Sequence, residues 1–298
     1  MRKIRKQKKT KRLILWMFLL VILLIIGTFF TNFKAKNFKE EVIHDPIEPH
    51  YRQESKIPKT LVSREILNSP LKRIQLPIIM YHYVEYVKDP KDTTRKSLDI
   101  NPYEFDYQLK TLVANGYQSY FVRDVPSMLK GLKEPAKKSI ILTFDDGYED
   151  FYTDAFPVLK KYNFKATVYI IVDFIGKRGF LNEKEIRELV QSGLVEIGSH
   201  TLNHYYLKKA PKAQAQEEIT LSKTKLESLF GVSVDTFAYP FGALDESSIE
   251  LVKESSYSAA VSVAPGNILT PVNLFYLPRI RAGNITGPEM IRILERTR

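Results

Sequence analysis

The sequence predicts an α/β fold in which helices cover a closed or partly closed barrel of parallel strands. From about residue 77 onward, short and almost purely apolar runs recur, which is typical of strands buried on both faces. Stretches with helical spacing separate these runs, as the crossover connections of a parallel sheet require. Seven or eight such units suffice to close a barrel, whose chemistry then belongs at the carboxyl ends of the strands.

Each predicted element follows from its own pattern of apolar residues. Strands are expected at residues 77–83, 119–122, 139–144, 166–172, 195–199, 234–239, 259–263 and 276–281, with 119–122 the weakest pattern. Helices are expected at residues 102–115, 150–162, 183–192, 213–230, 245–254 and 288–296.

Composition excludes several classes of protein. Of the 298 residues, 44% are hydrophobic and 27% charged, as in globular proteins, so wholesale disorder and low-complexity structure are excluded. Because the chain has no cysteine, any metal must be held by His, Asp or Glu. The net charge of +11 is concentrated at one end, since residues 1–12 carry eight basic residues and no acidic ones. The remaining 37 basic and 34 acidic residues nearly balance.

The segment 13–30 has the properties of a membrane anchor. Its eighteen residues carry no charge, and as a helix they would span roughly 27 Å, close to the thickness of the bilayer's hydrocarbon core. The basic cluster before it predicts a cytoplasmic N-terminus and an outward-facing remainder. A cleaved signal peptide is the alternative, but its apolar core would be long, and no clear small-x-small site follows Gly27.

We therefore predict four regions in a single-pass protein of the cell membrane. Residues 1–12 form a cytoplasmic flank, 13–30 the anchor, 31–72 an extracellular stalk rich in polar residues and proline, and 73–298 the globular domain.

Two adjacent carboxylates follow the predicted strand 139–144. Asp145 and Asp146 precede Gly147, and a tight turn there would send the two side chains in different directions. Because neighbouring carboxylates repel each other, at least one of them favours a bound cation. A polar turn that caps the next helix is the alternative.

Two histidines follow the predicted strand 195–199. His200 and His204 are four residues apart, so one helical turn would place both rings on the same side. Surface or capping histidines are the alternative. At the ends of two strands of one barrel, Asp146, His200 and His204 would form a two-His-one-carboxylate metal site with positions open for water and substrate. Asp145 beside it would then act as a base.

These two motifs resemble those of the polysaccharide deacetylase family, also called the NodB-homology or carbohydrate esterase family 4 domain. The likeness covers residues 77–281, most of the outer part of the chain. The resemblance implies a distorted (β/α) barrel, a divalent metal that is often zinc, and hydrolysis of N-acetyl groups on hexosamines of a glycan. It further implies that Asp145 is the catalytic base and that Asp146, His200 and His204 are the metal ligands.

The third family motif is altered in this chain. Where the family has Arg-x-Pro-Tyr, residues 238–241 read Ala-Tyr-Pro-Phe. The family uses the backbone N–H after the proline as an oxyanion donor, which Phe241 retains because the donor is main chain. The missing arginine leaves Asp145 without its usual orienting partner. Arg279, at the end of the strand 276–281, is a candidate replacement, and a structural arginine is the alternative.

The family's general acid is a histidine near the C-terminus, but no histidine follows His204. His82 remains, at the end of the first predicted strand. The Met-Tyr-His sequence at 80–82 and the altered third motif resemble the branch that deacetylates poly-β-1,6-N-acetylglucosamine and related surface glycans, in which the acid comes from the start of the domain. A buried histidine bonded to main chain is the alternative. Tyrosines that flank the motifs are candidates to line a substrate groove or, alternatively, to pack in the core: Tyr81, Tyr83, Tyr148, Tyr205, Tyr206 and Tyr239.

The sequence thus predicts a membrane-anchored, extracellular, metal-dependent N-deacetylase of a polysaccharide that contains N-acetylglucosamine. An O-acetyl esterase of wall glycans is one alternative. A catalytically inactive glycan-binding surface protein is another, which the missing arginine favours and the intact metal motifs disfavour. A nucleic-acid partner is not expected, because the basic excess is explained by membrane topology.

Overall fold

The computed structural model describes residues 72–89, 91–281 and 283–296. The predicted cytoplasmic flank, the anchor and all of the stalk except Lys72 lie outside these residues. Among the helices that are described, none has the length and apolar character needed to cross a membrane.

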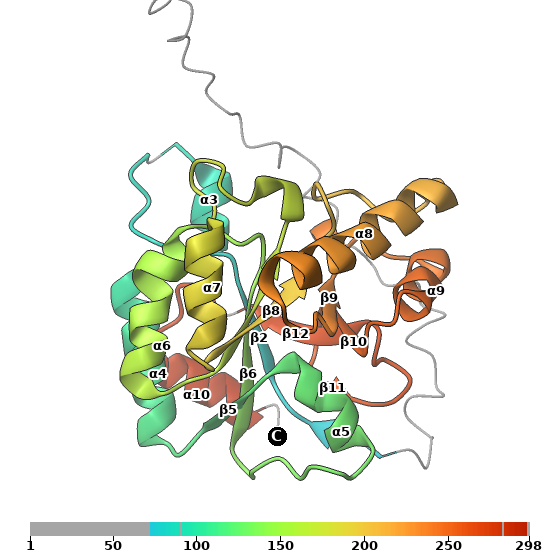
Figure 1. Cartoon of the computed structure of the whole chain (residues 1–298). Coiled ribbons are helices and arrows are strands. Elements are labelled where there is room, and N and C mark those ends of the chain that lie inside the picture. The colour runs from blue at the N-terminus through green and yellow to red at the C-terminus, as the bar shows by residue number, and fades with distance from the viewer. Residues whose placement is uncertain (1–71, 90, 282, 297–298) are drawn as a thin grey trace, which may run out of the picture. The chain divides into compact units, whose positions relative to one another are not determined.

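Seven parallel strands close into a barrel (Figure 1). They are β2 (Ile78–Tyr81), β6 (Ser139–Phe144), β7 (Ala166–Ile170), β8 (Val195–Ser199), β9 (Thr236–Ala238), β10 (Ala259–Pro265) and β12 (Leu277–Arg281). Their order around the barrel is β2-β12-β10-β9-β8-β7-β6, and the pairing of β6 with β2 completes the ring. The predicted seven- to eight-unit barrel is therefore present with seven strands in the ring.

An eighth strand, β5 (Gln118–Tyr120), distorts the barrel. It pairs with the first half of β6, at residues 139–141, whereas β7 pairs with the second half, at residues 143–144. Ser119 on β5 accepts a hydrogen bond from the backbone N–H of Lys165, just before β7. The strand thus separates β6 from β7 at the amino ends and leaves them paired at the carboxyl ends, where the polar motifs lie.

Two short strand pairs were not predicted. β1 (Ile74–Gln75) pairs antiparallel with β11 (Ile268–Leu269), and β3 (Tyr83–Val84) pairs parallel with β4 (Asp99–Ile100). The predicted strand 77–83 is therefore two strands, β2 and β3, which are interrupted at His82. This break places His82 at the carboxyl end of β2.

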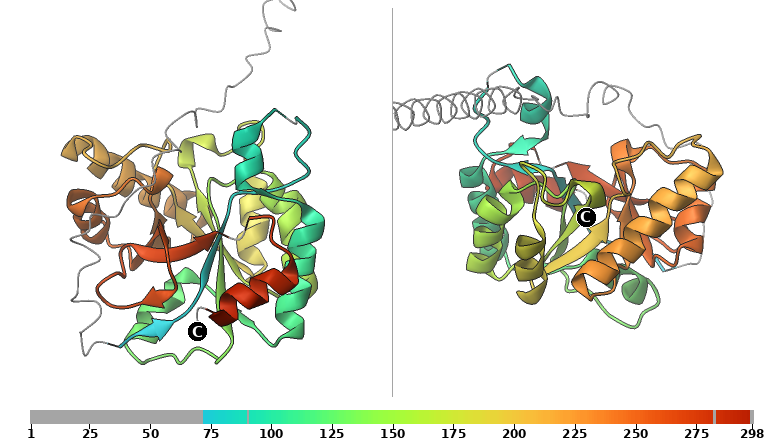
Figure 2. Two further views of the ribbon diagram at one scale, coloured as in Figure 1. Left: turned by 180° about the vertical axis from the view of Figure 1, so that it is seen from behind. Right: turned by 45° about the horizontal axis from the view of Figure 1, so that its top comes forward.

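Helices surround the barrel in an outer layer. They are α3 (Thr93–Leu98), α4 (Pro102–Ala114), α5 (Val125–Leu129), α6 (Phe156–Tyr162), α7 (Glu183–Gln191), α8 (Lys212–Phe230), α9 (Glu246–Glu254) and α10 (Gly287–Arg296). Short 3-10 segments occur at Val122–Asp124, Val172–Phe174 and Pro240–Gly242, and a π-helical turn at Phe151–Ala155 leads into α6. α4, α6, α7 and α10 lie along one flank of the barrel and α8 and α9 along the opposite flank, as both views show (Figures 1 and 2).

The chain marks the ends of these helices with capping residues. Asn101 accepts a hydrogen bond from the N–H of Glu104 at the start of α4, and Asn182 and Glu185 form a capping box at the start of α7.

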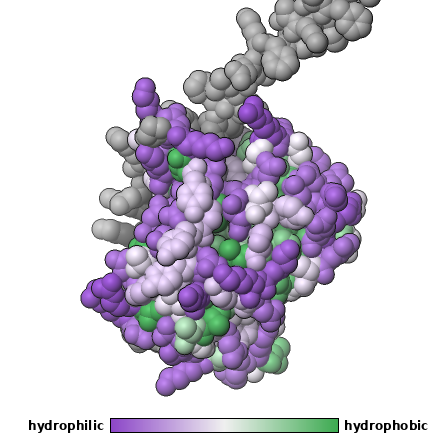
Figure 3. All heavy atoms as spheres, turned by 90° about the vertical axis from the view of Figure 1, so that its left-hand side faces the viewer, coloured by the Kyte–Doolittle hydropathy of each residue, from purple (hydrophilic) through white to green (hydrophobic). Residues whose placement is uncertain are grey.

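The outward surface over α4, α6 and α7 is mostly hydrophilic, with small and separate apolar patches (Figure 3). All six predicted helices are present, within two residues of their expected starts apart from the π-helical turn before α6.

The barrel interior is filled by side chains that alternate along the strands. One apolar cluster inside the barrel includes Ile78, Ile141 and Tyr169, all fully buried. A Cβ on Gly198 would lie 2.4 Å from the Tyr169 ring, so only glycine fits opposite this tyrosine. A second and larger cluster lies between the strands and the helices. The barrel interior is consequently a packed core, so a binding or catalytic site can form only at the ends of the barrel.

Candidate active site

The carboxyl ends of the barrel strands bring the predicted polar residues together. Asp145 and Asp146 follow β6, His200 follows β8, and Arg279 lies on β12. Parallel strands end at the same face of a barrel, so residues separated by more than a hundred positions meet there. Each of these four side chains is buried.

Asp146, His200 and His204 converge on one point. One ligand atom from each residue lies within 4.8 Å of the other two. The Asp146 Oδ1 atom is 3.2 Å from His200 Nε2 and 3.3 Å from His204 Nε2. This is the convergence that the two sequence motifs predict for a metal site.

The hydrogen bond of His200 turns its Nε2 toward this point. Its Nδ1 lies 2.8 Å from the backbone carbonyl oxygen of Ala238, which can only accept, so Nδ1 is the donor and Nε2 is the atom that faces Asp146. The Asp146 Oδ1 atom is buried, and no described residue donates a hydrogen bond to it. A carboxylate oxygen and two imidazole nitrogens that converge in a buried site are ligand atoms of the kind that bind divalent metals, so the residues fit such an ion.

The electrostatics keep these ligands in the forms that bind metal. Burial raises the pKa of Asp146, but the positive charge that the neighbouring imidazoles carry in acid, that of His204 above all, outweighs this effect and holds the pKa below its usual range. Burial lowers the pKa of His204 to about 4. At neutral pH the carboxylate is therefore ionised and the His204 ring is neutral.

Unusual backbone conformations are concentrated at this site. Seven described residues other than glycine have positive φ, and four of them are Asp146 (73°), Thr201 (68°), His204 (65°) and Phe241 (59°). The left-handed region costs an L-residue about 1–2 kcal/mol, so the surrounding structure must hold these residues in place. At Asp146 the consequence is visible, because its side chain and that of Asp145 point to different partners.

Asp145 pairs with Arg279 instead of with the metal ligands. Two guanidinium nitrogens of Arg279 lie 2.7 Å from the two carboxylate oxygens of Asp145, a bidentate contact. Arg279 is held in turn by the carbonyl oxygen of Ser262 and the hydroxyl of Thr143. Burial raises the pKa of Asp145, but Arg279 outweighs it, so that the pKa lies below its ordinary value and the carboxylate is ionised.

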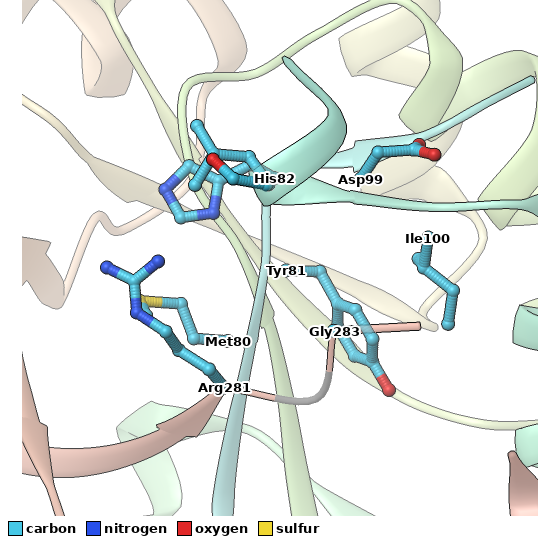
Figure 4. Close-up of a pocket in the computed structure, with 9 residues that line it drawn as sticks. Met80, Tyr81, His82, Asp99, Ile100, Arg281 and Gly283 are labelled. Atoms are coloured by element: carbon cyan, nitrogen blue, oxygen red, sulfur yellow. The ribbon is translucent and has the colours of Figure 1, made fainter. Parts of the chain in front are cut away.

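His82 lies on the other side of Asp145. Its Nε2 is 3.9 Å from Asp145 Oδ2. Burial lowers the pKa of His82, and the carboxylates of Asp145 and Asp146 act in the opposite direction without reversing the shift. The ring lines a small pocket together with Arg281, and both side chains extend to the same side of β2, away from Asp99 (Figure 4).

Phe241 lies in the 3-10 turn that follows β9. The N–H groups of Gly242 and Ala243 donate to the carbonyl oxygens of Tyr239 and Pro240, which closes the turn. The Phe241 ring packs against the His204 ring, with centroids 4.2 Å apart. The turn thus lies beside the metal ligands, where the sequence predicts an oxyanion donor.

Comparisons with known proteins agree with this geometry. The family model named polysaccharide deacetylase matches residues 132–260. The chain is 34% identical over 210 residues to the Bacillus subtilis protein named "Putative polysaccharide deacetylase YxkH". The aligned region covers 70% of this chain and 72% of that protein. The chain belongs to the polysaccharide deacetylase family. It is therefore a metal-dependent amide hydrolase in class, and its Asp-His-His cluster is consistent with a divalent metal.

Further relatives of this deacetylase were found by sequence and by structure. It is 28% identical over 240 residues to a poly-β-1,6-N-acetyl-D-glucosamine N-deacetylase of Staphylococcus aureus, across 75% of this chain and 81% of that protein. Its fold matches the Streptococcus pyogenes deacetylase PplD in complex with acetate, with a TM-score of 0.69 and 30% identity over 75% of this chain and 99% of that one. A polysaccharide deacetylase from Bacillus cereus matches with a TM-score of 0.67 and 31% identity, over 74% of this chain and 69% of that one.

Of the tyrosines that are candidates to line a groove, Tyr81, Tyr148 and Tyr239 are buried in this deacetylase, as the core-packing alternative expects, which corrects the groove prediction for these three. Tyr81 is 3% exposed, and its hydroxyl donates to Gln108. Tyr239 is 1% exposed, and its hydroxyl donates to the carbonyl of Phe275. Tyr148 is 4% exposed and stacks on Tyr83, with ring centroids 3.9 Å apart. These rings therefore pack in the core next to the strand ends.

Sequence reasoning missed three groups that hold the site. The Ala238 carbonyl orients His200, and Thr143 contacts Arg279. Glu218, on α8, accepts hydrogen bonds from the N–H groups of Leu202 and Asn203 and so fixes the loop between the two histidines. Thr143 lies inside the first motif and offered a signal, whereas a lone glutamate within a helix offered none.

Proposed function

We propose that this protein is a membrane-anchored, extracellular N-deacetylase that removes acetyl groups from N-acetylglucosamine residues of a cell-surface or cell-wall polysaccharide. The observation that carries the proposal is the separation of two adjacent carboxylates. Asp146 faces two imidazoles, whereas Asp145 is held by Arg279 and faces His82. Metal-assisted amide hydrolysis combines a metal that activates water with a separate base beside it, and the two carboxylates supply one group for each task.

The proposed chemistry assigns a role to each side chain. A zinc ion held by Asp146, His200 and His204 would supply a water of lowered pKa and would polarise the acetamide carbonyl. Asp145 accepts a proton from the attacking water, and the bidentate contact with Arg279 keeps the carboxylate ionised and aimed. Arg279 thereby takes the place of the arginine that the third family motif lacks here.

Two further groups complete the reaction. The Phe241 backbone N–H stabilises the negative charge that develops on the acetyl oxygen. His82 donates a proton to the departing amine, so that acetate and a free amino sugar leave. Burial lowers the pKa of His82, so its protonated form gives up a proton more readily than a free imidazolium does, while a smaller share of the rings carries that proton at neutral pH.

The substrate class and the location rest on separate support. The Staphylococcus aureus relative is named for poly-β-1,6-N-acetyl-D-glucosamine, which favours a polymer of N-acetylglucosamine here. The uncharged segment 13–30 behind a basic cluster favours an anchor with the domain outside the cytoplasm. Deacetylation there would give the glycan cationic amines and change its adhesion to anionic surfaces.

An acetate-release assay tests the proposed function. Purified full-length protein is stripped with a chelator, reloaded with Zn²⁺ or other divalent ions, and supplied with N-acetylated and O-acetylated glycans. We expect acetate from N-acetylglucosamine polymers, loss of at least about a hundredfold after chelation, and recovery on reloading. Release from O-acetylated glycans alone would identify an esterase instead. Metal binding without release from either would identify an inactive glycan-binding protein.

A further inference from the structure

An exposed aromatic ring lies beside the metal ligands. Tyr206 is 45% exposed, and its ring centroid is 6.1 Å from that of Phe241, whose ring in turn lies 4.2 Å from that of His204. The three rings form a series that begins at a metal ligand and ends at the surface. Single exposed aromatics are common in proteins, but this one continues directly from the candidate active site.

The backbone around Tyr206 holds it in this position. The preceding residue, Tyr205, is half-buried against the core, and its N–H donates to the Thr201 hydroxyl. The following residue, Leu207, is buried. Tyr206 therefore points outward from a segment that is fixed on both sides.

Phe241 is held at a conformational cost. Its φ of 59° lies in the left-handed region, which glycine would occupy without penalty. The strain persists although the next residue is already Gly242. A phenylalanine kept in this conformation presents its ring to both His204 and Tyr206, which a glycine would not.

The two rings match the chemistry of a sugar face. A hexosamine with equatorial substituents presents C–H groups on its ring faces, and these pack on aromatic faces while the hydroxyls remain in water. We propose that Tyr206 and Phe241 form a subsite that stacks on the sugar next to the one that loses its acetyl group. The proposal rests on the proposed function for the glycan class, and it makes the protein selective for oligomers over single sugars.

Calorimetric titration tests the subsite without requiring turnover. Zinc-loaded full-length protein is titrated with β-1,6-linked N-acetylglucosamine oligomers of one to five residues. We expect Tyr206→Ala to weaken binding of the pentamer about tenfold, and Tyr206→Phe and Tyr206→Trp to retain it, since the ring provides the contact. Phe241→Leu, which keeps the backbone N–H, is expected to weaken pentamer binding as well.

The matched control is Tyr107→Ala, which removes a 36% exposed tyrosine from α4, in the outer helix layer. Pentamer affinity in this control should equal that of the wild type. The subsite proposal is overturned if Tyr206→Ala binds the pentamer as tightly as the wild type, or if the wild type binds no oligomer better than the monomer. If pentamer binding depends on Tyr206 but no acetate is released, the subsite stands and the proposed hydrolysis fails.

Discussion

At the scale of single residues, two adjacent aspartates acquire different chemistry from their partners. Asp146 adopts a φ of 73°, which turns its carboxylate toward His200 and His204. The carboxylate of Asp145 instead accepts two hydrogen bonds of 2.7 Å from the guanidinium group of Arg279. Both carboxylates have lowered pKa values, yet only that of Asp146 lies between the two imidazoles of the candidate metal site. The backbone turn, not the side-chain type, separates the proposed base from the proposed ligand.

Replacing the proposed base should separate catalysis from metal binding. In Asp145→Asn we expect acetate release to fall by about a hundredfold or more, because the amide cannot accept a proton from water. Zinc affinity should change by less than about threefold, since Asp146 and both histidines remain. Acetate release and zinc titration on the same preparation measure the two effects.

Folding must be checked in this variant, because Arg279 would keep a buried charge without its carboxylate. Loss of such a partner costs about 3 kcal/mol, so thermal unfolding should confirm that the variant is folded at the assay temperature. Acetate release at the wild-type rate from folded Asp145→Asn would remove Asp145 from the mechanism.

Most residues of this site could be predicted from the sequence, but the contacts between them could not. The motif pair alone predicts that Asp146 and the two histidines converge, because both motifs follow buried strands. Arg279 was only a candidate, since its distance from Asp145 depends on how the barrel closes. β2 lies between β6 and β12, and the contact spans 134 positions of sequence. Such long-range contacts have no local pattern from which they can be read.

At the scale of elements, helix α8 controls the loop that carries the histidines. Glu218 accepts hydrogen bonds from the N–H groups of Leu202 and Asn203 at 3.0 and 3.3 Å, and a third from the Asn203 side chain. It is almost fully buried beneath this loop. The helix thus acts on His200 and His204 without touching the reacting atoms, which makes Glu218 a positioning residue.

Removing this carboxylate should loosen the metal site. We expect Glu218→Ala to lower zinc affinity by about tenfold or more, because groups that orient metal ligands contribute on this scale. The adjacent Glu217 is exposed on the same helix and provides the control, since Glu217→Ala keeps the helix and changes the same charge. Zinc titration with a competing chelator measures both variants. Equal affinities in the two variants would show that α8 does not position the histidines.

Helices and strands were predicted correctly where they are long enough for the spacing of their apolar residues to be recognised. The helices and the ring strands follow from apolar spacing, whereas β1, β3, β4 and β11 have only two residues each and carry no detectable period. The break between β2 and β3 at His82 was missed for this reason, because all surrounding residues are apolar or aromatic. It nevertheless decides where His82 lies.

At the scale of the whole molecule, the barrel also holds a buried acid at the end opposite to the candidate active site. Glu196 lies near the start of β8, whereas His200 follows its end. Its carboxylate accepts hydrogen bonds from the hydroxyls of Thr167 and Thr236. Burial raises the pKa of Glu196 to about 7, since the threonine hydroxyls and Arg123, whose backbone N–H donates to the carboxylate at 3.4 Å, only partly offset the loss of water.

This acid should make the stability of the fold depend on pH. The folded-state pKa of about 7 lies above the ordinary value of 4.5, so the folded chain holds the proton more tightly than the unfolded chain. The contribution of Glu196 is therefore most favourable below pH 4.5 and is lost as the pH rises through 7, by up to about 3 kcal/mol.

Glu196→Gln, which stays neutral, should gain stability relative to the wild type as the pH increases from 5 to about 8. Urea unfolding at several pH values measures this difference, and Glu254→Gln on the exposed surface of α9 should show none. A constant difference between Glu196→Gln and the wild type across this range would mean that Glu196 is ionised in the folded protein throughout, and that the hydroxyls of Thr167 and Thr236 compensate fully for its burial.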